Sequence, residues 1–157
     1  MDENMIKTKR LILRMASDDE MRALIDEQTI DELRAAYKEM LDGALKNPEM
    51  RKWYVVWKME LLDGTYVGDY SFKGITPEGM VEIGYGVLPE YEGKGYATEA
   101  VTAATVWAAK QPGVTRIEAE TLADNIASQR VLEKSGYVPT GTIGEEGPRF
   151  IFKGSVV

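Results

Sequence analysis

The segment Leu88-Pro89-Glu90-Tyr91-Glu92-Gly93-Lys94-Gly95-Tyr96-Ala97-Thr98-Glu99-Ala100 lies between a strand pattern and a helix pattern. The apolar run 81–88 ends at a proline, two glycines follow one residue apart, and an amphipathic helix pattern then begins. At such a turn, unpaired N–H groups and the positive end of the helix dipole, about half a unit charge, point at one place. The segment therefore predicts a ligand that carries phosphate. A glycine turn without a ligand is the alternative.

The spacing of the glycines narrows the kind of phosphate site. A dinucleotide site needs G-x-G-x-x-G, but Pro89 stands where the third glycine would follow Gly84 and Gly86. A P-loop needs another glycine five residues before Gly93, where this chain has Leu88. The remaining G-x-G turn between a strand and a helix resembles the acetyl-CoA pyrophosphate loop of the GNAT superfamily of N-acetyltransferases.

Two further segments extend this resemblance to nearly the whole chain. The run 6–14, Ile-Lys-Thr-Lys-Arg-Leu-Ile-Leu-Arg, resembles the opening strand of the RimJ/RimL-type branch, which acetylates ribosomal-protein N-termini. The run 125–137 resembles the N-x-x-S…L-E-K-x-G-[FY] segment of that branch. The resemblance implies an α+β, GNAT-like acyl-CoA N-acyltransferase fold with a mixed, mostly antiparallel central sheet and helices on both faces.

Length and composition limit the possible chemistry. The 157 residues predict a single domain, 1–157, and no run approaches the ~18 apolar residues of a membrane span. The acidic N-terminus without an apolar signal core predicts a cytoplasmic protein that does not bind membranes. The net charge of −7 argues against nucleic acid as a partner. With no cysteine and no histidine, the chain offers neither a thiolate nucleophile nor the commonest general base, and we expect no metal site.

Hydrophobic periodicity and helix caps predict the order of the elements. A strand over 6–16 is followed by a helix from a Ser17 cap to about residue 27 and a helix over 30–46 with Thr29 as its cap. The remaining expected elements are strands 53–62, 66–74 and 81–88, a helix after the glycines, strand 115–122, helix 125–135 and strands 137–144 and 148–153.

The resemblance assigns residues to the coenzyme. It implies backbone pairing of the pantetheine arm with Val87 and Leu88, and a hydrogen bond from Asn125, which is also a plain helix cap. The loop residues expected at the pyrophosphate are Gly93, Lys94, Gly95, Tyr96, Ala97 and Thr98, with a solvated Lys94 as an alternative. The chain departs from the family pattern because Glu90 and Glu92 stand where glutamine or basic residues are frequent. We expect these carboxylates to weaken binding of the pyrophosphate.

The strand before the loop carries the first candidate for a general base. Alternation places Val81, Ile83, Tyr85 and Val87 on a core face and Glu82 on the other face, beside two glycines that leave space for a substrate. Glu82 is therefore the leading candidate, with a solvated glutamate as the alternative. Three rivals lie on other predicted strands: Asp69, Glu118 and Glu120.

The resemblance also suggests a proton donor for the leaving thiolate. In the RimJ/RimL-type pattern, Ser128 falls near the thioester sulfur, although a serine there also fits a helix cap. Many family members place a tyrosine acid where this chain has Leu132. Tyr137 is the reserve candidate, with a core role as its alternative.

These expectations combine into an enzyme that transfers an acetyl group from acetyl-CoA to a primary amine. Direct attack in a ternary complex is expected because no cysteine can carry the acetyl group. The acceptor is a protein N-terminus or a small amine. The alternatives are a non-catalytic acyl-CoA sensor and an antibiotic or polyamine acetyltransferase. A homodimer is also considered, with an interface at Trp53, Trp57 and the run 54–56; a buried strand would explain these residues equally well.

Overall fold

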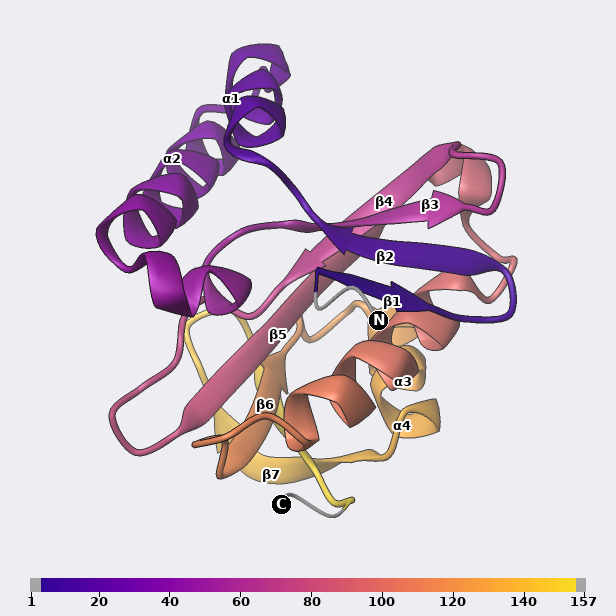
Figure 1. Cartoon of the computed structure of the whole chain (residues 1–157). Coiled ribbons are helices and arrows are strands. Elements are labelled where there is room, and N and C mark those ends of the chain that lie inside the picture. Colours follow the sequence, from indigo (N-terminus) through magenta and orange to yellow (C-terminus); the bar gives the residue numbers. More distant parts are fainter. Residues whose placement is uncertain (1–3, 155–157) are drawn as a thin grey trace.

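An eight-stranded sheet forms the centre of the computed structural model, which describes residues 4–154 (Figure 1). The strands are β1 (Met5–Lys7), β2 (Leu11–Met15), β3 (Trp57–Leu61), β4 (Tyr66–Ser71), β5 (Met80–Val87), β6 (Arg116–Glu120), β7 (Tyr137–Ile143) and β8 (Pro148–Phe152). Their spatial order is β1-β2-β3-β4-β5-β6-β8-β7, and every neighbouring pair is antiparallel except β5 and β6. The helices are α1 (Asp18–Glu27), α2 (Asp31–Lys46), α3 (Tyr96–Ala109) and α4 (Ile126–Lys134). The expected α+β fold class is confirmed.

The first strand of the sequence prediction is wrong in one respect, because the run 6–16 folds as the hairpin β1–β2. Thr8 makes the turn: its N–H donates to the Leu11 carbonyl at 2.9 Å, and its hydroxyl accepts from the Leu11 N–H at 3.1 Å. The Glu99 carboxylate in α3 holds the same turn from outside, accepting from the Thr8 hydroxyl at 2.6 Å. A hydroxyl side chain and a distant carboxylate thus make a turn without glycine or proline.

Local capping explains where α1 begins but not where α2 begins. Ser17 and Glu20 form the predicted capping box at the start of α1. The prediction of Thr29 as the cap of α2 is wrong: the capping residue is Ile30, which makes no side-chain bond. Arg14 on β2 donates to Glu20 at 2.8 Å and to Glu60 on β3 at 3.0 Å, which ties α1 to the sheet.

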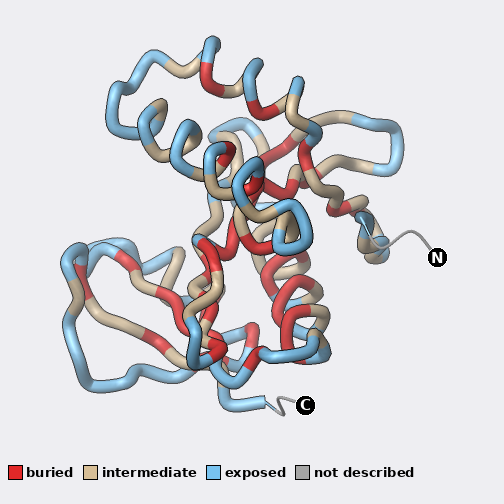
Figure 2. Tube along the Cα trace, turned by 60° about the vertical axis from the view of Figure 1, so that its left-hand side comes forward, coloured by how far each residue is buried: buried red, intermediate tan, exposed pale blue. Residues whose placement is uncertain are grey.

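Aromatic side chains fill the core between the sheet and α3. Trp53 and Trp57 are 1% and 0% exposed, and Trp107 of α3 lies 4.9 Å from Trp57 between ring centroids. Burial explains both tryptophans, so they cannot form the dimer interface considered above. The expected strand over 53–62 begins only at Trp57, because 48–53 form a 3-10 helix, η1 (Pro48–Trp53). Figure 2 shows the buried residues concentrated in the strands and along α3.

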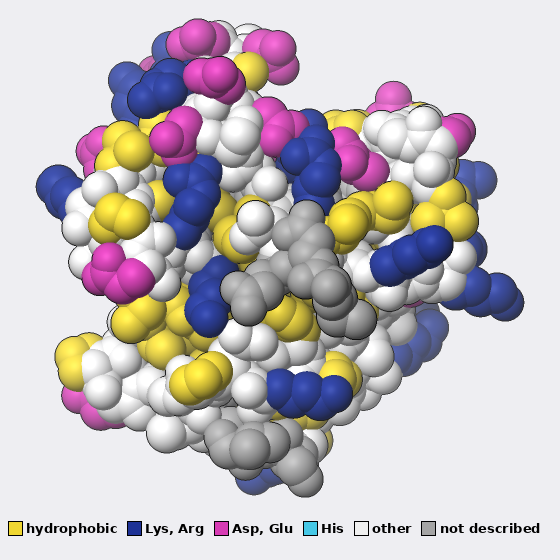
Figure 3. Space-filling model, viewed as in Figure 1, with side chains coloured by type: hydrophobic (Ala, Val, Ile, Leu, Met, Phe, Trp, Pro, Cys, Tyr) yellow, Lys and Arg dark blue, Asp and Glu magenta, His cyan; other side chains and the backbone are white. Residues whose placement is uncertain are grey.

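Helices lie on both faces of the sheet. Adjacent residues of β4 point to opposite sides: Tyr70 lies in the core with Trp57, 5.8 Å away between ring centroids, whereas Asp69 lines a cavity together with Tyr37 of α2. α3 and α4 contact each other, and α1 and α2 form a separate pair with its own small core (Figure 1). Acidic side chains gather around the α1 end of the molecule (Figure 3).

The second half of the chain follows the predicted order. Asn125 caps α4 by accepting from the Ser128 N–H at 3.0 Å, and Gly136 follows the helix with φ +92°. β7 and β8 then pair as an antiparallel hairpin. Over residues 4–154, no helix is both long and apolar enough to span a membrane.

Candidate functional site

A cleft of about 700 Å³ opens where β5 separates from β6. β6 pairs only with the first half of β5, and in the described chain the last pair is Ile83 with Ala119. Beyond that pair, β5 remains bonded to β4 alone. The cleft is lined by the end of β5, the glycine loop, and one side of α4: Tyr85, Gly86, Val87, Tyr91, Glu92, Gly93, Gly95, Tyr96, Ala97, Thr98, Asn125, Ala127, Ser128, Arg130, Val131 and Lys134.

The glycine loop leaves main-chain N–H groups open at the start of α3. Gly93 and Gly95 have φ values of +75° and +83°, which side chains rarely adopt, and a Cβ at Gly93 would point into open space. Gly95 is the N-cap of α3, and no side chain of the described residues caps that helix. The N–H groups of its first turn, at Tyr96, Ala97 and Thr98, therefore remain available for a ligand. These residues fit the pyrophosphate of acetyl-CoA.

Arg10 braces this loop from the β1–β2 hairpin. Its guanidinium donates to the Lys94 carbonyl at 2.9 Å and to the Glu99 carboxylate at 2.7 Å, and it lies 4.6 Å from the centroid of the Tyr96 ring. Burial alone would raise the pKa of Glu99, but hydrogen bonds from Thr8 and Arg10 outweigh it and hold that pKa below its usual range. The Lys94 side chain itself is exposed and does not line the cleft.

The main chain of β5 presents one edge to the cleft. The Leu88 N–H donates to the Val67 carbonyl of β4 at 2.8 Å. Because hydrogen bonds alternate along an antiparallel strand, the main-chain groups of Val87 and Tyr85 point away from β4, into the gap. The main-chain edge of Val87 is thus open toward the cleft, whereas the Leu88 N–H is already bonded and Leu88 lines a different cavity.

Ser128 lies in the cleft beside a tyrosine that the sequence analysis assigned to the core face. The Tyr85 hydroxyl lies 2.7 Å from the Ser128 hydroxyl and donates to the Ser128 carbonyl at 3.0 Å. Burial raises the pKa of Tyr85, so the phenol keeps its proton. The signal that could have indicated this pair is the polar end of Tyr85, since a half-buried phenol normally needs a partner.

Tyr137 lies outside the cleft. It is 2% exposed, and its hydroxyl forms a 2.8 Å hydrogen bond with Thr105 of α3. Burial raises the pKa of Tyr137 well above its usual range. Tyr137 is thus a core tyrosine at the start of β7, as the alternative interpretation of this residue expected.

The charges around the cleft partly balance. Glu92 lines the cleft, while Glu90 is exposed and does not. Arg130 and Lys134, one turn apart on α4, also line the cleft and supply positive charge. The sequence analysis did not select them, because a helix pattern does not tell which exposed cations face a ligand.

Glu82 is held in ion pairs away from the cleft. Its carboxylate accepts from Lys73 at 3.1 Å and from Arg149 of β8 at 2.9 Å. Burial would raise the pKa of Glu82, but these two cations outweigh it and lower the pKa. The predicted face is correct, yet the space beside the glycines is partly taken by Lys73, whose Cε would lie 3.0 Å from a Cβ at Gly84.

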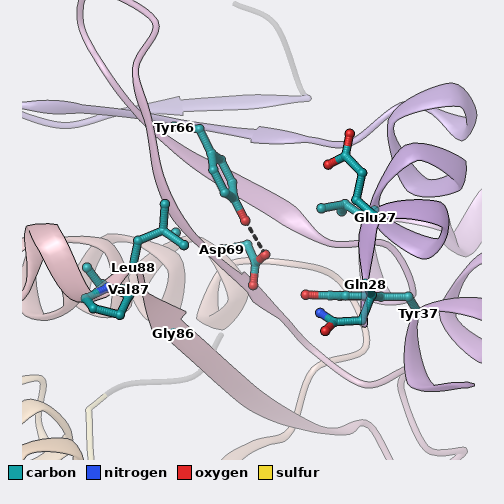
Figure 4. Close-up of a pocket in the computed structure, with 11 residues that line it drawn as sticks. Glu27, Gln28, Tyr37, Tyr66, Asp69, Gly86, Val87 and Leu88 are labelled. Atoms are coloured by element: carbon teal, nitrogen blue, oxygen red, sulfur yellow. Dashed lines mark hydrogen bonds between the residues drawn. The ribbon is translucent and has the colours of Figure 1, made fainter. Parts of the chain in front are cut away.

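A second cavity, of about 330 Å³, lies across β5 from the cleft (Figure 4). The end of α1, one residue of α2 and the strands β4 and β5 line it: Leu24, Glu27, Gln28, Tyr37, Tyr66, Gly68, Asp69, Gly86, Val87, Leu88 and Pro89. Arg34 of α2 holds the α1–α2 corner above the cavity by donating to the carbonyls of Ile25, at 3.2 Å, and Gln28.

Gly86 and Val87 line both the cleft and the second cavity. A Cβ at Gly86 would meet no heavy atom within 4 Å, so this strand position is open. A molecule in the cleft and a molecule in the cavity can therefore approach each other at this point of β5. In the described part of the chain, no group of three or more His, Cys, Asp or Glu side chains is arranged to hold a metal ion.

Comparisons with known proteins identify the family of this chain. Residues 7–138 match the family described as the acetyltransferase (GNAT) domain. The uncharacterized N-acetyltransferase YoaA of Bacillus subtilis (strain 168) is 27% identical over 150 residues, covering 88% of this chain and 85% of YoaA. YjdG of the same organism, also named as an uncharacterized N-acetyltransferase, is 36% identical over 89 residues, and this match spans 55% of the chain and half of YjdG, 50%.

A solved structure shows the same fold. The RimL ribosomal-protein acetyltransferase in complex with coenzyme A superposes with a TM-score of 0.72 at 18% sequence identity, covering 94% of this chain and 96% of the RimL chain. At this identity the likeness concerns the fold alone.

Proposed function

Since this chain belongs to the acetyltransferase (GNAT) family, we propose that it transfers an acetyl group from acetyl-CoA directly to a primary amine. The observation that carries the proposal is the pair of hollows that share Gly86 and Val87. The glycine loop supports placing acetyl-CoA in the cleft, and the acceptor then enters from the opposite cavity. The acceptor is a small amine or a protein N-terminus.

The residues of the cleft suggest how each part of acetyl-CoA is held. The first-turn N–H groups of α3, together with Arg130 and Lys134, would bind the pyrophosphate. The free main-chain edge of Val87 and the Asn125 side chain would hold the pantetheine arm. When bound, acetyl-CoA supplies the activated acetyl group.

The chain's own groups support two further tasks. Ser128, hydrogen-bonded to Tyr85, would donate the proton that the leaving thiolate needs. The strand edge at Val87 would position the acetyl group toward Gly86, where no side chain blocks the amine. Direct attack follows because the chain has no cysteine to carry the acetyl group.

The test combines two measurements on the wild-type protein. Calorimetric titration with CoA measures binding in the cleft, and release of free thiol from acetyl-CoA measures transfer to each amine. The panel holds peptides with different N-terminal residues, lysine peptides, polyamines and aminoglycosides. Transfer to one class would support the proposal and identify the acceptor; CoA binding without any transfer would favour the non-catalytic sensor.

A further inference from the structure

We propose that the second cavity receives the acceptor as a primary ammonium group on the Asp69 carboxylate, and that Asp69 takes the proton that the amine must lose before attack. This inference rests on the proposed acetyl transfer and adds the group that recognises and deprotonates the acceptor. Asp69 would contact the substrate and is thus a catalytic residue in this scheme.

Three of the four carboxylates considered from the sequence are already bound by one arginine. Arg149 donates to Glu82 at 2.9 Å, to Glu118 at 2.9 Å and to Glu120 at 2.7 Å. Each of these carboxylates therefore already has a permanent cation at hydrogen-bond distance, which makes it a weaker site for a second cation. Asp69 is the fourth, and it is hydrogen-bonded by a neutral phenol: Tyr66 donates to it at 2.6 Å.

Asp69 is placed at the point where the two hollows meet. It stands opposite Gly86 in the antiparallel pairing of β4 and β5, so both residues face the cavity. Because Gly86 has no side chain, nothing attached to that strand position covers the carboxylate. Figure 4 shows Asp69 hydrogen-bonded to Tyr66, with the phenol of Tyr37 pointing toward the same space.

The surroundings of Asp69 favour a cationic guest. Burial raises the pKa of Asp69; the Tyr66 hydrogen bond and the Lys58 charge oppose this but do not reverse it. The Lys58 ammonium, from β3, is itself engaged by Glu20 at 2.9 Å. Burial and the nearby Asp69 charge raise the pKa of Tyr37 to about 12, so that phenol stays neutral.

The remaining charged group of the cavity strengthens this preference. Glu27, from the end of α1, lies at the exposed rim and adds a second negative charge. Lys58 is bound by Glu20, and Tyr37 and Tyr66 are neutral phenols. An entering ammonium would therefore supply a countercharge that Asp69 otherwise lacks at hydrogen-bond distance.

The proton balance of the reaction agrees with one base of this kind. The ammonium gives one proton to Asp69, and the neutral nitrogen then bonds to the acetyl carbon as the carbon–sulfur bond breaks. The nitrogen loses a second proton to water, and the thiolate takes one from Ser128, which regains it from water. The amide and free CoA therefore form with the net release of one proton, which passes from Asp69 to solvent.

The experiment measures amine binding and transfer separately in the full chain. The protein saturated with CoA, which has no acetyl group to transfer, is titrated calorimetrically with small primary alkylamines and with peptides bearing a free N-terminus. N-acetylated forms of the same compounds serve as negative ligands. The variants are Asp69→Asn, which keeps the acceptor for Tyr66, and Glu27→Gln, which removes the same charge from the rim of the same cavity.

The expected result is a loss of amine affinity of about tenfold or more in Asp69→Asn, unchanged CoA affinity, and a smaller loss in Glu27→Gln. With acetyl-CoA, the fall in kcat/KM should grow as the pKa of the amine rises from about 8 toward about 10.5, because basic amines depend most on a proton acceptor. Comparing alkylamines with peptides in the titration shows whether small amines or protein N-termini bind in the cavity.

Any of three results would overturn the assignment of Asp69 while leaving acetyl transfer intact. The first two are unchanged amine binding in Asp69→Asn and an equal fall in kcat/KM for every amine. A wild-type protein that transfers acetyl groups but binds none of the amines in this way would also overturn it. If the wild type binds amines through Asp69 but transfers nothing, the ammonium site stands and the proposed transfer fails.

Discussion

The hydroxyl of Tyr85 lies 2.7 Å from the hydroxyl of Ser128, joining β5 to the first turn of α4 across the cleft. Asn125 fixes Ser128 by capping that turn, and Tyr85 also bonds the Ser128 carbonyl. Two contacts to its main chain and one to its hydroxyl thus hold Ser128 in place. If this pair supplies the proton to the leaving thiolate, its removal should affect the rate more than binding.

The first prediction concerns this pair. Ser128→Ala should lower kcat by about 10- to 100-fold, in the range of general-acid effects, while the Kd for CoA changes less than about threefold. Tyr85→Phe should lower kcat less, because Ser128 keeps its hydroxyl. Assays of thiol release measure kcat, and calorimetry measures the Kd for CoA. A Ser128→Ala enzyme with wild-type kcat would remove Ser128 from the mechanism.

The second prediction concerns the charge of the cleft. Glu92→Arg should tighten CoA binding about five- to tenfold at low salt, because it replaces repulsion of the pyrophosphate by attraction. Glu90→Arg makes the same change in net charge on a residue that does not line the cleft, and it should have a much smaller effect. Raising the ionic strength toward 1 M should erase most of the gain. Equal effects of both substitutions would show that only the overall charge matters.

The sequence predicted most of the elements because their signals are local. The Ser17 capping box, the Asn125 cap and the glycines of the loop each depend on residues a few positions apart. The β1–β2 turn was missed because its Thr8 and Arg10 are held by Glu99, 91 and 89 positions away in the chain. A contact over that distance leaves no periodic pattern in the sequence.

The parts of the candidate site that are formed by the main chain could be predicted from the sequence. The glycine turn before α3 follows from the glycine positions, whereas the main-chain role of Val87 was implied by the family resemblance. Side chains that meet only in the folded protein were not predictable: alternation placed Tyr85 on a face but could not identify Ser128 as its partner. The same limit applied to the carboxylates, since nothing local indicates that Arg149 binds Glu82 while Asp69 faces a cavity.

The third prediction concerns the passage at Gly86. Its φ lies outside the left-handed region in which side chains are strained, and a Cβ would meet nothing within 4 Å, so Gly86→Val should fold normally. Its side chain would project into the second cavity opposite Asp69 and should lower kcat/KM by about 100-fold, since displacements near 1 Å can cost that much. CoA affinity should change little.

A neighbouring glycine offers the control for this substitution. Gly84 lies on the same face of β5, two residues further from the shared point, where a Cβ would press only on the flexible Lys73 side chain. Gly84→Ala should therefore retain most of the activity. If Gly86→Val remains fully active, the acceptor does not pass Gly86.

The fourth prediction concerns acid stability. The hydrogen bond from Arg14 chiefly lowers the pKa of Glu20, with Lys58 adding to it. A lowered carboxyl pKa contributes stability above the pKa of the unfolded state, near 4.5, and this contribution is lost as the pH falls through the folded value. Glu20→Gln should thus reduce the free energy of unfolding at pH 7 by about 1 kcal/mol, an amount limited by partial exposure. Urea unfolding at several pH values measures it, and a loss that persists undiminished in acid would contradict the ion-pair origin.

The fifth prediction concerns Asp69 and has the opposite sign. Burial raises its pKa, so the folded protein binds the proton more tightly than the unfolded chain, and stability falls as the pH rises from about 4 through the folded value.

Asp69→Asn removes this cost while keeping the acceptor for Tyr66. At pH 7 its thermal midpoint should exceed that of the wild type by about 2–4 °C, roughly 1 kcal/mol for a domain of this size. The difference should shrink as the pH falls through about 4 and vanish near about 2, where the wild-type carboxyl is protonated in both states. A gain in stability together with a loss of amine binding would identify Asp69 as a group kept for function at the expense of stability. A midpoint below that of the wild type at pH 7 would instead show that the carboxylate stabilises the fold.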